Sequence, residues 1–216
     1  MEAYLMQFAD LVLHLDRHLP AIMEAYGHLI YAILFLVVFC ETGLVVTPFL
    51  PGDSLLFACG ALAAASPDGM DIAIVVPVFL VSGILGDACN YFIGEKFGAA
   101  ILKSERGLIN PAHIQKASDF YARHGHKAIF LARFVPIVRT IAPFVAGLGK
   151  MHYLTFAHYN VIGAVTWVLV FVGGGYFFGN IPFVKQNFPL VTLGIVVFSL
   201  MPVIYEVIGK KLLGKK

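Results

Sequence analysis

The sequence predicts an all-α polytopic membrane protein that forms a single membrane domain over residues 1–216. Only 13% of its residues are charged and 59% are hydrophobic, with a mean hydropathy of +0.84, whereas soluble domains carry about 25% charged residues. Residues 151–184 and residues 186–205 contain no Asp, Glu, Lys or Arg, and about 20 such residues can span a bilayer. Two further apolar stretches are interrupted by prolines, which predicts helical hairpins that enter the membrane and return.

Residues 1–27 are expected to hold an interfacial helix on the outer face of the membrane. The segment lacks the basic stretch of a secretory signal. Apolar side chains recur at helical spacing over residues 2–18, with polar side chains on the opposite face. An amphipathic helix of this kind lies in the plane of the membrane surface.

The first predicted hairpin lies in the apolar stretch from Gly27 to Ala65. Pro48, Pro51 and Gly52 interrupt it, and the arm that follows would reach only about 18 Å. Because a bilayer core is about 30 Å thick, this arm is too short to cross it. A re-entrant hairpin therefore fits better than two spans.

The second predicted hairpin covers residues 126–149 and is interrupted by Pro136 and Pro143. Three spans are expected at residues 72–94, 152–179 and 187–208. If both hairpins are re-entrant and opposed, eleven lysines and arginines lie inside and two outside; if each crosses once, the division is eight against five. The positive-inside rule therefore favours opposed re-entrant hairpins, with the C-terminus in the cytoplasm.

A weak internal repeat supports this arrangement. Phe49-Leu-Pro51 recurs as Phe134-Val-Pro136, and Tyr91-Phe-Ile-Gly94 recurs as Tyr176-Phe-Phe-Gly179, both at a spacing of 85 residues. The expected order is a first hairpin and span over 28–98, an amphipathic cytoplasmic connector over 99–125, a second hairpin and span over 126–180, and a final span with a basic tail over 181–216. Inverted repeats with broken helices are a transporter design.

Arg133 and Arg139 lie in the second hairpin, where a charge costs roughly 2.5–3.5 kcal/mol even on the lenient insertion scale. They are six residues apart, and a break at Pro136 allows both to face one cavity. Guanidinium groups bind phosphate as a two-pronged fork and stay charged at any working pH. We therefore expect these two residues to bind an anionic substrate, or else to form structural ion pairs with nearby acids.

Glu41 and Asp53 are the matching acids of the first hairpin. Glu41 could carry a proton or pair with an arginine, because burial and a neighbouring cation shift a carboxyl in opposite directions. Asp53 follows Pro51-Gly52 and could cap the returning helix, carry a proton, or do both.

Asp87 is expected either to line the cavity or to bond across to another helix with Asn90 or Tyr91. The other residues expected to support the cavity are Pro48, Pro51, Gly52, Tyr91, Pro136 and Pro143. The eight histidines show no metal-binding pattern, so neither a metal nor a cofactor is expected. The net charge of +2 is too small to indicate nucleic acid.

The chain resembles the DedA family, whose core is the VTT or SNARE-associated domain, and it is similar to the founding bacterial subgroup. The resemblance rests on Glu41…Pro48-x-x-Pro-Gly-Asp53, Gly83-x-x-Gly-Asp87-x-x-x-Tyr91-x-x-Gly94, Arg133-Phe-Val-Pro-Ile-Val-Arg139 and Asn160-x-x-Gly-Ala-x-x-Trp167. It implies a multi-pass protein of the bacterial inner membrane with two opposed re-entrant loops. It also implies that Glu41, Asp53, Arg133 and Arg139 are functional.

The function expected first is lipid translocation between leaflets by a flippase or scramblase linked to the proton-motive force. The resemblance implies undecaprenyl phosphate or phosphatidylethanolamine among the lipid partners. The runner-up is a proton-coupled exporter of small cations or drugs, in which the acids bind the cargo. An enzyme is not expected, because no nucleophile or His–Asp pair is in register. The oligomeric state stays open, with a homo-oligomer among the alternatives.

Overall fold

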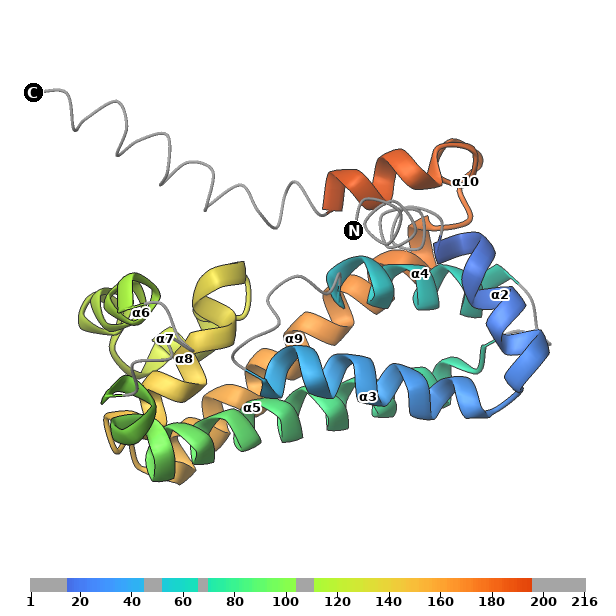
Figure 1. The fold of residues 1–216 in the computed structure, drawn as a ribbon. Coiled ribbons are helices and arrows are strands. Elements are labelled where there is room, and N and C mark those ends of the chain that lie inside the picture. The colour runs from blue at the N-terminus through green and yellow to red at the C-terminus, as the bar shows by residue number, and fades with distance from the viewer. Residues whose placement is uncertain (1–14, 45–51, 66–69, 104–110, 196–216) are drawn as a thin grey trace, which may run out of the picture. The chain divides into compact units, whose positions relative to one another are not determined.

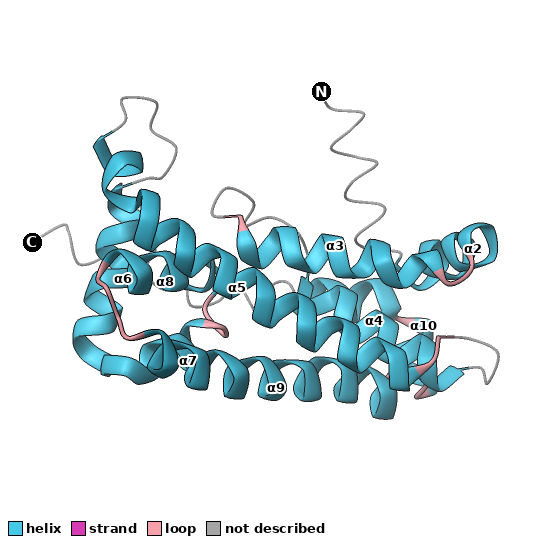
Figure 2. Ribbon diagram, turned by 90° about the horizontal axis from the view of Figure 1, so that it is seen from below, coloured by secondary structure: helices cyan, strands magenta, loops and turns pink. Residues whose placement is uncertain are grey.

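A computed structural model describes residues 15–44, 52–65, 70–103 and 111–195. Within these ranges the chain forms helices joined by short loops and no strands (Figures 1 and 2), which confirms the all-α prediction. The elements are α2 (Leu15–Tyr26), α3 (Leu29–Gly43), α4 (Gly52–Ala65), α5 (Ile72–Lys103), α6 (Pro111–His124), η1 (Gly125–Lys127), α7 (Ala128–Ala132), α8 (Pro136–Leu148), α9 (Tyr153–Phe178) and α10 (Pro182–Gln186).

Some predicted features fall outside the described residues. Most of the interfacial helix over residues 2–18 is among them, as are Pro48 and Pro51. Of the final span over 187–208, residues 188–195 are described and helical.

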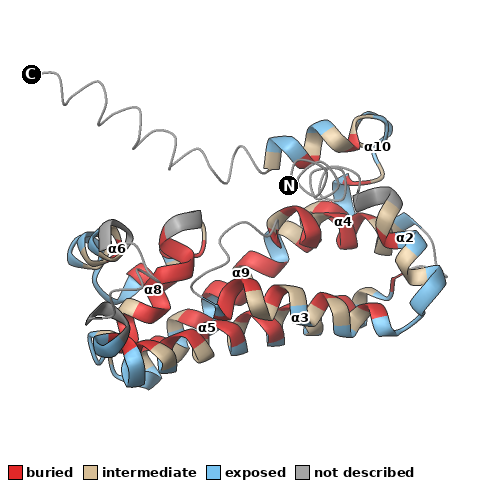
Figure 3. Ribbon diagram, viewed as in Figure 1, coloured by how far each residue is buried: buried red, intermediate tan, exposed pale blue. Residues whose placement is uncertain are grey.

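Helices α5 and α9 are long and apolar enough to cross a membrane. At 1.5 Å per residue, their 32 and 26 residues extend about 48 and 39 Å, beyond a hydrocarbon core of about 30 Å. Only 39% of the apolar window of α5 and 33% of that of α9 is buried, and Figure 3 shows exposed and intermediate stretches along both helices. Leu154, Leu169 and Phe177 of α9 are among the exposed large hydrophobic residues. The central helix of a soluble protein would be covered instead, so these helices are two of the predicted spans.

The two predicted interruptions are described to different extents. For the first, α3 ends at Gly43 and α4 begins at Gly52, and residues 45–51 between them lie outside the described part of the chain. The second separates α7 from α8: Val135 is extended (φ −122°, ψ 101°), and Pro136 is the first residue of α8. The cause is local, because a proline ring excludes helical geometry at the preceding residue and is itself well suited to the first helical position.

The described chain divides into two compact units, each built from separate segments of sequence. The first unit combines residues 1–37, 51–81 and 168–198, and the second combines 38–50, 82–167 and 199–216, within which only the described residues are discussed. Each unit is described by itself. Each contains one short helix that follows an interruption, α4 or α8, together with part of each long helix. The first unit holds residues 72–81 of α5 and 168–178 of α9, and the second holds residues 82–103 and 153–167.

In the first unit, α4 packs on the second half of α9 through glycines. A Cβ added at Gly60 would collide with the carbonyl of Val172, and one added at Gly175 would collide with the carbonyl of Phe57. Asn180 adds a hydrogen bond of 3.0 Å from its Nδ2 to the carbonyl oxygen of Ala61. Small residues let the two backbones approach closely, as is common between helices in membranes.

In the second unit, α8 packs on α5 in the same manner. A Cβ at Gly147 would collide with the carbonyl of Tyr91, and one at Gly94 would collide with the carbonyl of Phe144. Each of these contacts has a counterpart in the first unit. A residue of α8 corresponds to the residue of α4 that lies 87 positions earlier, and a residue of α5 corresponds to the residue of α9 that lies 81 positions later. A third contact, between Gly98 and Leu148, has a counterpart under the same two shifts.

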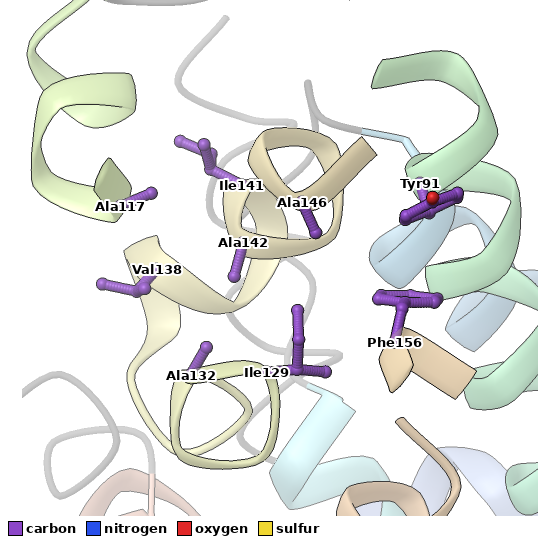
Figure 4. Close-up of a cluster of buried hydrophobic side chains, with 9 residues drawn as sticks. All are labelled: Tyr91, Ala117, Ile129, Ala132, Val138, Ile141, Ala142, Ala146 and Phe156. Atoms are coloured by element: carbon purple, nitrogen blue, oxygen red, sulfur yellow. The ribbon is translucent and has the colours of Figure 1, made fainter. Parts of the chain in front are cut away.

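The core of the second unit joins α6, α7 and α8 to the facing helices α5 and α9. Tyr91 stacks on Phe156 with ring centroids 4.6 Å apart (Figure 4). Tyr121 of α6 donates a hydrogen bond of 3.1 Å to the carbonyl oxygen of Ala142 in α8. Burial, reinforced by the charge of Asp87, raises the pKa of Tyr121, so its hydroxyl remains a donor.

Candidate functional site

Four charged side chains lie buried together in the second unit. Glu41 comes from the last turn of α3, Asp87 from α5, Arg133 from the break after α7, and Arg139 from the first turn of α8. Their side chains are only 3–8% exposed. With two acids and two bases ionised, the cluster has no net charge, which limits the cost of burying it.

The charges form two ion pairs. Arg133 Nη2 donates a short hydrogen bond to Asp87 Oδ2. Arg139 Nη2 lies 3.3 Å from Glu41 Oε1. Buried pairs are sensitive to loss of one member, because the remaining charge then lacks compensation.

Two asparagines fix the helices that carry these charges. Asn160 of α9 accepts a hydrogen bond of 2.6 Å from Arg133 Nη2 and donates one of 3.1 Å to the carbonyl of Ile84 in α5. Asn90 of α5 donates to two backbone carbonyls, at 3.1 Å to Thr42 and 2.7 Å to Thr140. The carbonyl of Thr42 lies in the last turn of α3, where carbonyls have no partner within the helix. Asn90 therefore joins the end of α3 to the start of α8.

Trp167 lies beneath both guanidinium groups. The Cζ of Arg139 is 4.5 Å from the centroid of the indole ring, and the Cζ of Arg133 is 5.6 Å from it. The indole is fully buried. A cation over an aromatic face is attracted by the ring quadrupole, more strongly where water is excluded. The indole therefore holds the two guanidinium groups over one surface.

Two glycines leave space for Arg133. A Cβ at Gly83 of α5 would lie 3.3 Å from Arg133 Nη1, and one at Gly163 of α9 would lie 3.3 Å from Arg133 Nε. Both distances are tighter than ordinary contacts, so a side chain at either position would press on the guanidinium. These glycines shape the site as well as the helix contact.

Buried oxygens that accept no hydrogen bond within the described part of the chain include two that lie close together on α5. They are Asp87 Oδ1 and Asn90 Oδ1, on the same helix and three residues apart. Buried polar atoms normally have a partner, so such atoms mark a place where a donor or a proton can bind. No group of metal-binding side chains occurs among the described residues.

The structure brings together three of the four residues singled out from the sequence, Glu41, Arg133 and Arg139. The fourth, Asp53, lies half-buried in the first turn of α4 in the first unit. There its carboxylate suits the positive end of the helix dipole. The described part of α4 begins at Gly52, and the residues before it lie outside the described part of the chain, so a capping role for Asp53 stays a prediction.

Of the supporting residues, Asp87 bonds across helices to Arg133, one of the two alternatives expected from the sequence. Tyr91 donates a hydrogen bond to the carbonyl of Met151 just before α9. Pro136 begins α8, and Pro143 lies buried within it. The sequence does not predict three features of the site, namely Trp167, Asn160 and the two hydrogen bonds that Asn90 donates. The available signal was a polar residue, or the chain's single tryptophan, inside an apolar span.

Comparison with known proteins gives consistent results. The model of the VTT domain matches residues 50–177. Protein DedA of Escherichia coli (strain K12) is 52% identical over 94% of this chain and 93% of its own length. The inner membrane protein YqjA of the same strain is 33% identical, covering 84% of this chain and 80% of that protein.

An uncharacterized membrane protein of Mycobacterium tuberculosis is 39% identical over 82% of this chain and 78% of its own length. No solved structure matches. Two of these names describe membrane proteins and none of them names an enzymatic activity, and the family is of a transporter type and not an enzyme family. Together with its spans and its buried charges, the match of the VTT domain and the identity over nearly the whole chain establish that this protein is a membrane protein of the DedA family.

Proposed function

We propose that the protein is a lipid translocase of the bacterial inner membrane. It moves an anionic or zwitterionic phospholipid, or a polyprenyl phosphate such as undecaprenyl phosphate, between leaflets, linked to the proton-motive force. The observation that carries this proposal is the pair of buried guanidinium groups, Arg133 and Arg139, above Trp167 in a membrane protein. Guanidinium pairs suit a phosphate group, and buried charges in membranes mark substrate pathways.

The chemistry is an exchange of partners. In the resting site the carboxylates of Asp87 and Glu41 hold the two guanidinium groups. A phosphate head group offers anionic oxygens, as a carboxylate does, so it can replace a carboxylate while the arginine stays paired with an anion. The N-terminus of α8 lies at the same place, and its positive dipole end adds to the attraction for an anion.

The proposal includes two opposed re-entrant hairpins related as inverted repeats. Its support is the matched glycine packing of α4 on α9 and of α8 on α5, together with the positive-charge count. The C-terminus and α6 then lie in the cytoplasm, and the end of α4 lies outside. Inverted repeats of this kind build the central sites of transporters.

This topology predicts opposite labelling of two exposed positions. With Cys40, Cys59 and Cys89 replaced by serine, the cysteine of Ala65→Cys should react with a membrane-impermeant maleimide in intact cells. The cysteine of Ala122→Cys should react only after the inner membrane is opened. Labelling of both from one side would rule out the opposed hairpins.

Lipid exchange itself is tested by purifying the protein, reconstituting it in vesicles and following defined fluorescent lipids between leaflets. Arg139→Lys should lose most of the exchange activity, at least tenfold, because an ammonium group keeps the charge but not the planar fork. Arg123→Lys, at an exposed position of α6, is the matched control and should exchange lipid normally. Wild-type vesicles without exchange of any phosphate-bearing lipid would reject the proposed function, and transport of a small cation instead would favour a cation exporter.

A further inference from the structure

We propose that Asp87 and Asn90 together form the proton-accepting site of this protein, and that Asp87 takes up one proton for each anionic head group that engages Arg133. The role in head-group binding rests on the proposed function. The proton site itself rests on the hydrogen bonds and ion pairs of Asp87 and Asn90 and can be tested separately.

The first argument is the pair of oxygens without donors. Asp87 Oδ1 and Asn90 Oδ1 are both buried, and neither accepts a hydrogen bond within the described residues. Residues three apart on a helix lie on the same face. A proton on Asp87 Oδ1 would turn that atom into a donor, and Asn90 Oδ1 is an acceptor on the same face of the helix. One shared proton could then serve both atoms.

The second argument is that Asn90 cannot satisfy the carboxylate of Asp87 by flipping its side-chain amide. Its Nδ2 donates to the carbonyls of Thr42 and Thr140, and both bonds would be lost if the amide were flipped. Because an amide has donors only on nitrogen, its Oδ1 must remain an acceptor. The asparagine is therefore held as a fixed acceptor beside a carboxyl group.

The third argument is charge balance. The groups that act on Asp87 are Arg133 after α7, Arg139 of α8 and Tyr121 of α6, with Glu41 of α3 paired to Arg139. With Asp87 and Glu41 ionised against the two arginines, the site is neutral. A monoanionic phosphate would leave it with one negative charge in excess, which is costly inside a membrane. Uptake of one proton from the aqueous side restores neutrality.

Asp87 is the carboxyl group best placed to take this proton. Its Oδ2 is bound to Arg133, the arginine that also bonds Asn160. When a phosphate replaces that carboxylate on Arg133, Asp87 loses its ion-pair partner, while Arg139 remains paired with Glu41. The proton then binds Asp87, Asn90 accepts the new hydrogen bond, and Arg133 stays charged for the phosphate.

The proton site is tested by infrared spectroscopy on the purified protein. Titration should reveal the C=O stretch of a protonated carboxylic acid in the wild type and in Glu41→Gln, and this band should be lost in Asp87→Asn. Because that variant could fail to fold, wild-type protein and Asp53→Asn carrying ¹³C-labelled aspartate side chains give a second measurement, in which the band should shift in both. A band that is absent, that does not shift, or that disappears in Glu41→Gln would overturn the assignment.

The coupling is tested with dihexanoyl phosphatidylglycerol, whose phosphodiester does not titrate near neutral pH. Calorimetry in buffers of different ionisation enthalpy should give about one proton taken up per lipid bound, and the Kd should rise about tenfold per pH unit on the alkaline side. In Asp87→Asn, uptake should vanish and the Kd should become independent of pH. Binding by the wild type without proton uptake would overturn the coupling alone, whereas no binding of any anionic lipid would overturn the proposed function and the coupling with it.

Discussion

Replacing Trp167 with alanine is expected to lower the free energy of unfolding by about 3–5 kcal/mol and to abolish lipid exchange. The indole is fully buried, so its removal leaves a cavity in the second unit. It also removes the surface on which both guanidinium groups lie, at 4.5 and 5.6 Å from the ring centroid. The measurement is thermal or denaturant unfolding in detergent, together with exchange assays in vesicles.

Two variants separate packing from the contact with the arginines. Trp167→Phe keeps an aromatic face and should retain part of both the stability and the activity. Leu169→Ala lies on the same helix at an exposed position, so it should change neither by much. If Trp167→Ala unfolds at the wild-type denaturant concentration, the indole does not organise the site as described.

The second large effect is expected from the pair of Arg139 and Glu41. Arg139→Met leaves the carboxylate of Glu41 buried without its cation, and breaking a buried pair in this way costs about 3–5 kcal/mol. The double variant Glu41→Gln with Arg139→Met removes both charges and should recover most of the lost stability. Neither variant should exchange lipid, because the anion-binding fork is absent from both.

A double-mutant cycle measures the coupling energy between Glu41 and Arg139 directly. The single variants Glu41→Gln and Arg139→Met and the double variant are unfolded under one set of conditions, and the three changes in free energy are compared. A coupling energy near zero would show that the two side chains contribute independently and that the ion pair has little effect on stability. Lys150→Met, which removes an exposed cation, is the matched control and should unfold like the wild type.

Much of this fold could be predicted because membrane helices follow from composition. The spans α5 and α9 are evident from uncharged apolar sequence, and Pro136 marks the break before α8. The same break explains why Arg133 and Arg139, six residues apart, can lie over one indole ring. These features depend on the local amino-acid composition and on single prolines, both of which can be read directly from a sequence.

The partners of the buried charges could not be predicted in the same way. Arg133 binds Asp87, for which the sequence allows both a place in the cavity lining and a bond across helices. Which acid meets which arginine depends on how each helix is rotated about its axis, and no local pattern encodes that. The internal repeat illustrates the point: recurring letters suggest a spacing of 85, while the glycine contacts follow shifts of 87 and 81.

The glycine contacts also bear on how the chain can fold as it is made. The surface on which α4 packs, around Val172 and Gly175 of α9, follows Gly60 by about 110 residues of synthesis. At the 5–20 residues per second of translation, α4 would wait roughly 6–22 seconds for its partner. During that interval its small residues face lipid or the insertion machinery, so the first half of the protein is made before it can fold. A chain released early, after α5, would therefore be a substrate for membrane proteases and not a stable half-protein.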